Sequence, residues 1–157
     1  MKDNEKVTLV QPEENSPEEK ELGMGWHDFL VIWYGISGWV GIIVGIATIV
    51  IGSIALEPAG MLGGILSFGV AAITLATRKK LNDFDSDAID FLKIMYGARL
   101  VNIFMDIVLS LIMNPSHEVD IKDVIFDVLR VVIFAAINLS YYKKREDMFI
   151  DEDDDEE

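Results

Sequence analysis

The sequence predicts an all-α, polytopic membrane protein with four transmembrane helices in two hairpins. Four apolar stretches are each near or above the ~20 residues that a helix needs to cross ~30 Å of hydrocarbon. A basic triplet follows the second stretch and another follows the fourth, which is typical of helices that end at a membrane surface. We place the four spans at residues 29–56, 59–77, 91–113 and 122–142.

The two ends of the chain are predicted to be tails. Residues 1–28 and 143–157 are too few for an independent soluble core. Their polar, largely acidic composition predicts disorder. Most of the acids behind the net charge of −14 lie in these tails, so that charge does not identify a partner.

The first hairpin is predicted from small residues and one proline. Ser37, Gly41 and Gly45 recur at four-residue spacing, a pattern that lets helix backbones approach closely. Proline at residue 58 fits the first turn of a helix, and the acid before it complements the helix dipole. We therefore expect spans one and two to form a close-packed pair, with Gly41 and Gly45 as helix-packing residues.

The orientation follows from the two basic triplets, residues 78–80 and 143–145. Loops rich in Lys and Arg stay on the cytoplasmic side, and four spans put both triplets on that side. We expect a multi-pass protein of the plasma membrane with cytoplasmic N- and C-termini.

The two polar loops are predicted to be solvated turns. The loop between spans two and three, residues 81–90, begins with Asp-x-Asp-x-Asp like the calcium-binding loop of an EF-hand. Ala88 and Ile94, however, stand at the positions where an EF-hand loop needs Gly and Glu. We expect an acid or serine of residues 85–87 to cap span three. The loop between spans three and four holds His117, Glu118 and Asp120, which are too few convergent ligands to predict a metal site.

Polar residues inside spans three and four form the main candidate site. They are Arg99, Asn102, Asp106, Asp127, Arg130 and Asn138. An ionised side chain in a bilayer costs ~2.5–3.5 kcal/mol even on the most permissive scale, so the four charged members need a reason. Helical spacing puts the members of each span near one face. Depth counting puts Arg130 within reach of Asp106, and it lies three residues from Asp127.

Two interpretations of this cluster stay open. One is a neutralised ion-pair network that fixes how spans three and four pack, in which Arg130 contacts Asp106, Asp127 or both. Arg99 would then hydrogen-bond Asn102 or Asn138, or reach towards the cytoplasmic surface. The other is a polar site in a small transporter or channel. The equal number of Arg and Asp favours the first.

Other chemistry is not expected. The chain has no cysteine, which excludes disulfides, thiolate metal sites, iron–sulfur clusters and a cysteine nucleophile. The sequence also lacks a His-rich cluster, a glycine-rich phosphate loop and a Gly-x-Ser-x-Gly elbow. We expect no enzyme activity, no cofactor, no metal and no nucleic-acid partner.

The two ends of the membrane domain carry a resemblance. Span one opens with Trp-His-Asp-Phe-Leu at residues 26–30, and span four closes with Asn-Leu-Ser-Tyr-Tyr-Lys-Lys-Arg at residues 138–145, followed by Phe149. This layout resembles small four-span bacterial membrane proteins. The resemblance implies four spans and a bacterial source, and it carries over no functional residue.

The sequence therefore predicts an integral membrane interaction or accessory protein that acts through helix packing. Its expected partners are the lipid bilayer and either further copies of itself or a larger membrane complex. The alternative is a small oligomeric transporter or channel that uses the intramembrane Arg/Asp cluster.

Overall fold

The computed structural model describes residues 24–113 and 120–149, and over that part of the chain it is all-α. The elements are α1 (Gly25–Ala55), α2 (Pro58–Asn82), α3 (Ala88–Met113), α4 (Ile121–Lys143) and the 3-10 turn η1 (Glu146–Met148). All four α-helices are long and apolar enough to cross a membrane, which confirms the predicted fold class. Most of the predicted tails, and the turn that holds His117 and Glu118, lie outside the described residues.

The helices extend somewhat beyond the predicted spans. α1 begins at Gly25, so residues 25–28, expected to be tail, are helical. α2 was expected to end at residue 77 but continues to Asn82, so its basic triplet lies inside the last turns. Cations in the last turn of a helix interact favourably with the negative end of its dipole, which allows the helix to continue through them.

The first and second connections use the same backbone device. After α1, Leu56 adopts a left-handed conformation with φ 55°, and the N–H of Glu57 bonds the carbonyl of Gly52 at 2.8 Å. After α2, Phe84 is left-handed with φ 51°, and the N–H of Asp85 bonds the carbonyl of Lys80 at 3.0 Å. Both are Schellman-type endings, which satisfy carbonyls left free at a helix C-terminus.

Glycines bring the backbones of α1 and α2 into contact. A Cβ atom added at Gly41 would lie 2.8 Å from the Ala71 Cβ, and one added at Gly45 would lie 2.9 Å from the backbone nitrogen of Phe68. On the α2 side, a Cβ at Gly64 would lie 2.8 Å from the backbone nitrogen of Ile49. These helices therefore approach more closely than any larger residue allows.

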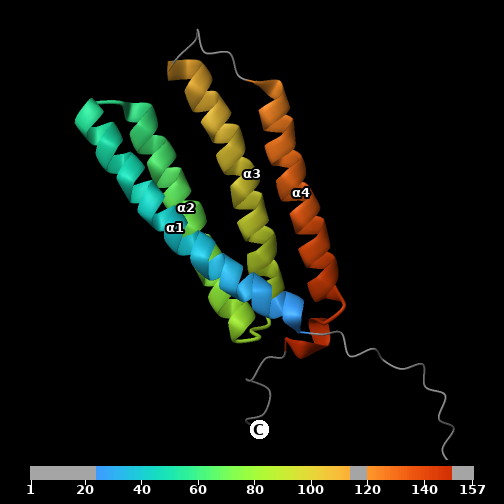
Figure 1. Cartoon of the computed structure of the whole chain (residues 1–157). Helices are drawn as coiled ribbons and strands as arrows, with labels where there is room; N and C mark the ends of the chain where they lie inside the picture. Colours follow the sequence, from blue (N-terminus) through green and yellow to red (C-terminus); the bar gives the residue numbers. More distant parts are fainter. Residues whose placement is uncertain (1–23, 114–119, 150–157) are drawn as a thin grey trace, which may run out of the picture.

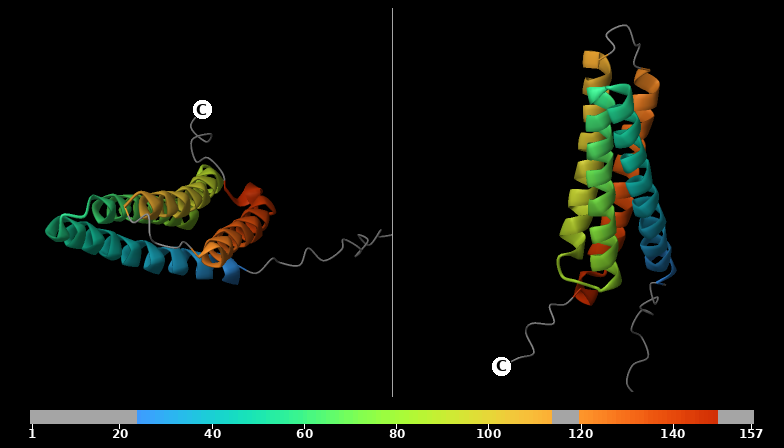
Figure 2. Two further views of the ribbon diagram at one scale, coloured as in Figure 1. Left: turned by 90° about the horizontal axis from the view of Figure 1, so that it is seen from above. Right: turned by 90° about the vertical axis from the view of Figure 1, so that its left-hand side faces the viewer.

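The four helices meet at one end of the bundle and diverge towards the other (Figure 1). We call the meeting point the basic end, because it carries residues 78–80 and 143–145. Seen from above in Figure 2, the α1–α2 pair and α4 lie apart at the opposite end.

The buried core lies at the basic end, where the helices converge. Its largest fully buried side chains come from all four helices: Leu30, Tyr34, Thr74, Thr77, Leu81, Leu92, Met95, Asn138 and Tyr142. Phe149, just after η1, packs against the same cluster. Towards the opposite end most large apolar side chains are exposed, as expected of surfaces that face lipid.

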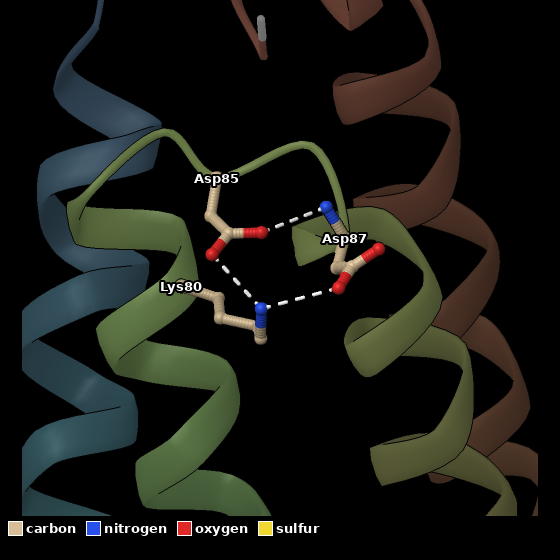
Figure 3. Close-up of polar contacts among 3 residues, drawn as sticks. All are labelled: Lys80, Asp85 and Asp87. Carbon is tan, nitrogen blue, oxygen red and sulfur yellow. Dashed lines mark hydrogen bonds and ion pairs between the residues drawn. The ribbon is translucent and has the colours of Figure 1, made fainter. Parts of the chain in front are cut away.

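The loop between α2 and α3 is held by one lysine and two acids (Figure 3). Lys80 Nζ lies 2.8 Å from Asp85 Oδ2 and 3.3 Å from Asp87 Oδ2. The other oxygen of Asp85 accepts the backbone N–H of Asp87 at 2.9 Å, just before α3 begins. The Lys80 ammonium and this N–H lower the pKa of the Asp85 carboxyl. Asp85 is thus one member of residues 85–87 whose side chain holds the backbone just before α3.

Adding one methyl group at Gly45 should separate α1 from α2, whereas the same change at Gly69 should not. Gly69 has no atom within 4 Å of an added Cβ. Gly45→Ala should lower the free energy of unfolding by ~1–3 kcal/mol through overpacking. Gly69→Ala should leave it unchanged or raise it by up to ~1 kcal/mol through helix propensity. Thermal unfolding in mild detergent measures both, and equal shifts for the two variants would contradict the close approach at Gly45.

Candidate functional site

The six predicted polar residues line two neighbouring cavities along α3 and α4. Arg99, Asn102, Arg130 and Asn138 line one groove, and Asp106 and Asp127 line a smaller pocket nearer the opposite end. Asn138 also belongs to a neutral network at the basic end.

Asn138 is the centre of the neutral network. Its side chain is fully buried. Its amide nitrogen donates to the hydroxyls of Tyr34, at 3.1 Å, and Tyr96, and its carbonyl oxygen accepts from Trp26 Nε1 at 3.0 Å. The two tyrosine hydroxyls also bond each other at 2.8 Å. One amide thus joins α1, α3 and α4, and each of its polar atoms has a partner, as a buried amide requires.

This network corrects the expected role of Asn138. It was predicted to flank a charged face and to be a possible partner of Arg99, but its bonds go to uncharged aromatic side chains. The signal for Tyr34 and Tyr96 was present in the sequence, since each places a hydroxyl inside an apolar stretch. Buried tyrosine hydroxyls usually find a hydrogen-bond partner.

A layer of aromatic rings closes the bundle below the network. The ring of His27 stacks on Phe84 with centroids 4.9 Å apart, and its Nδ1 lies 3.2 Å from the Tyr142 hydroxyl. Phe149 packs on Phe84 and on Tyr142, each with centroids 5.7 Å apart. The left-handed backbone of Phe84 places its ring between those of His27 and Phe149, and these two ring contacts explain why that conformation is kept.

Arg145 belongs to this layer and is only 6% exposed, although it was predicted as part of a surface triplet. Its guanidinium lies 3.8 Å from the centroid of the Tyr141 ring, and its Nη1 donates to the Tyr141 carbonyl at 3.3 Å. Arginine stacks on aromatic faces in this way with its charge retained.

Of the two acids expected as partners of Arg130, the one that forms an ion pair with it is Asp127. Arg130 Nη2 lies 3.2 Å from Asp127 Oδ1, one turn away on α4. Among the described residues, Asp106 instead accepts a bond from Asn102 Nδ2 at 3.0 Å. Its carboxylate lies beside α2, since a Cβ added at Gly63 would be 3.9 Å from Asp106 Oδ1. The carboxylate is therefore turned towards α2, and a bridge from Arg130 to both acids is not formed.

Arg99 and Arg130 share a groove of about 590 Å³ between the helices. Its lining residues are Phe29, Leu30, Trp33, Tyr34, Ser37, Val70, Tyr96, Arg99, Asn102, Ile103, Arg130, Val131, Phe134 and Asn138. The Asn138 network forms the end of the groove nearest the basic end, and exposed aromatic side chains of α1 and α4 form its rim. Both charged residues in this lining are arginines.

A second pocket of about 230 Å³ lies nearer the opposite end of α3 and α4. It is lined by Ile103, Asp106, Ile107, Ser110, Asp120, Asp123, Val124 and Asp127. Ile103 borders both cavities, so the basic groove and the acidic pocket follow one another along the α3–α4 face. Within the described residues, no group of His, Cys, Asp and Glu side chains could hold a metal ion.

The pairing can be tested by double-mutant cycles in detergent. Arg130→Leu should be destabilising because it leaves Asp127 unpaired, and adding Asp127→Leu should recover part of the loss. We expect a coupling free energy of ~0.5–3 kcal/mol for this pair. Arg130→Leu and Asp106→Leu should be additive within ~0.5 kcal/mol, because their side chains have different partners. Coupling of Arg130 to Asp106 instead of Asp127 would refute this geometry.

Comparison with known proteins adds no assignment: no protein-family model matches the chain, nor does any curated protein or solved structure.

Proposed function

We propose that the chain is an integral membrane interaction protein that acts through helix packing, and that the α3–α4 face is its docking surface for a second copy. The observation that carries the proposal is the exposure of the Arg130–Asp127 ion pair. The Arg130 side chain is 60% exposed and that of Asp127 is 46% exposed, although both lie well inside a membrane-spanning helix.

The Arg130–Asp127 pair lies deep in its predicted membrane span. Thirteen residue steps separate Arg130 from the end of α4 at Lys143, which is ~20 Å along the helix and close to the middle of the hydrocarbon. A charged side chain facing lipid there costs ~2.5–3.5 kcal/mol or more. Covering the pair with protein removes that exposure, so helix association is favoured at this face.

A second copy has the chemistry to cover it. In a two-fold dimer with its axis along the membrane normal, residues of equal depth meet across the interface. Asp127 and Arg130 lie one turn apart, so each Arg130 could pair with Asp127 of the second copy as well as with its own. Exposed apolar side chains on the same flank of α4, Phe126, Ile133 and Ile137, would pack around the charges.

Cross-linking of single cysteines tests this face, and the chain contains no cysteine of its own. Ile133 is 54% exposed and lies three residues from Arg130 on the same flank of α4. Val132 is 46% exposed at nearly the same depth but points ~100° away around the helix. In native membranes Ile133→Cys should form a disulfide-linked dimer, and Val132→Cys should not.

The outcomes separate the possible occupants. No cross-linking at either position, or equal cross-linking at both, would overturn docking of a second copy at this flank. Cross-linking of Ile133→Cys to a different protein would retain the interaction function and replace the second copy by a larger membrane complex.

We further propose that the chain is a bacterial plasma-membrane protein that crosses the membrane four times with the basic end on the cytoplasmic side. The support is the gathering of both basic triplets at one end of the bundle. Asp83 is exposed at that end and Glu57 at the opposite end. A membrane-impermeant maleimide added to intact cells should label Glu57→Cys and spare Asp83→Cys. The reverse pattern would invert the topology.

The alternative function is a small oligomeric transporter or channel. It is favoured by one observation, the succession of the basic groove and the acidic pocket along α3 and α4. A pathway needs water in the groove. Labelling of a cysteine at Ser37, which lines the groove, by a small water-soluble thiol reagent would support transport, and protection of that cysteine would support the packing function.

A further inference from the structure

We propose that the groove between α1, α3 and α4 is a binding site for a single-chain amphiphile with a carboxylate head, such as a long-chain fatty acid. The carboxylate would lie against Arg99, with Arg130 nearby. The acyl chain of the ligand would lie between the aromatic side chains of α1 and α4 at the rim of the groove. This site does not depend on a second copy of the protein.

The size of the groove decides the kind of occupant. Its volume of about 590 Å³ falls within the ~300–1,000 Å³ typical of small-molecule sites. The lining is mainly apolar with a few convergent polar groups, which is also typical of such sites. A transmembrane helix of a partner would cover the outside of the groove but would not fill it.

The charge of the groove decides the head group. None of the hydrogen bonds or ion pairs found among the described residues involves Arg99. Arg130 has one partner, Asp127, which does not line the groove. A guanidinium stays charged inside a protein and binds carboxylates in bidentate geometry. The groove therefore complements an anion, and Arg99 is its free donor.

The depth of Arg99 decides between a fatty acid and a phospholipid. Eight residue steps separate Arg99 from residue 91, where the predicted span begins, so the Arg99 Cα lies ~12 Å inside the membrane. A two-chain phospholipid keeps its phosphate in the headgroup layer and cannot bring it to that depth. A single-chain acid can enter laterally in its neutral form and ionise beside the arginine, because a nearby cation favours the charged form of a carboxyl group.

The aromatic side chains at the rim of the groove form the surface that would contact the acyl chain of the ligand. Phe29 and Trp33 project from α1 and Phe134 from α4, and each is about half exposed. Beneath them, the Asn138 network has all its polar atoms paired, so it closes the groove without competing for the ligand. An acyl chain between these rings would cover apolar surface on both helices.

The test uses the full chain in nanodiscs and radiolabelled palmitate as the probe. Palmitate should bind saturably, and hexadecanol, which has the same chain without the carboxylate, should not compete. Arg99→Gln should weaken binding at least tenfold. Lys93→Gln removes the same charge from α3 outside the groove, where Lys93 pairs with Asp90 at 2.6 Å, and should leave binding unchanged.

A second variant keeps the test decisive if Arg99→Gln does not fold. Ser37→Phe fills the groove without removing a charge, and it should also abolish saturable binding. Brominated stearate should quench tryptophan fluorescence in the wild type, and Trp33→Phe should reduce that quenching. Equal binding by wild type, Arg99→Gln and Ser37→Phe, or uptake no greater than that of empty nanodiscs, would overturn the site. Competition by phosphatidylglycerol as strong as by palmitate would also overturn it, because it would assign the groove to a phospholipid.

Discussion

The satisfaction of one buried amide, that of Asn138, is the constraint on which the arrangement of the helices depends. Its carbonyl oxygen and its nitrogen both bond side chains from helices far away in the sequence, Trp26 and Tyr34 on α1 and Tyr96 on α3. In a bilayer no water is present to replace a lost partner, so each bond holds its helix in place. The helices therefore converge where Asn138 lies and are free to diverge elsewhere.

That divergence creates the features that suggest function. Glycines hold α1 and α2 together, and no comparable small-residue seam joins α3 to α4 along the described residues. The space between α1, α3 and α4 is consequently left as a groove, and the Arg130–Asp127 pair remains half exposed. In a bilayer, a half-exposed ion pair favours association at its face of α4, and an open groove favours a small ligand. Arg130 belongs to both features, because it pairs with Asp127 and also lines the groove.

Much of the fold could be predicted because membrane physics leaves few alternatives. Length, apolar composition and basic triplets were enough for four helices, and the spacing of Gly41 and Gly45 indicated a face that the structure places against α2. α2 continues past residue 77, where its span was predicted to end, because a helix tolerates lysines in its last turns.

The candidate site was less predictable, for a definite reason. Helical spacing tells which residues share a face, but not how two helices rotate against each other. In the fold, Asp106 lies beside Gly63 of α2 and accepts a bond from Asn102, and Arg130 pairs with Asp127. The burial of Arg145 was not predicted, because the positive-inside rule treats a basic triplet as surface and does not show that its arginine stacks on Tyr141.

The Asn138 network also bears on the order of biosynthesis. Asn138 lies 112 positions after Trp26 and 104 after Tyr34, and α4 is the last of the four described helices to leave the ribosome. Until it is inserted, the hydroxyls of Tyr34 and Tyr96 can bond only each other, and the Trp26 indole has no Asn138 to donate to. The α1–α2 hairpin, held by its own glycine contacts, can assemble before that moment. α4 therefore completes the network, because it supplies the acceptor for Trp26 and the amide that bonds both tyrosine hydroxyls.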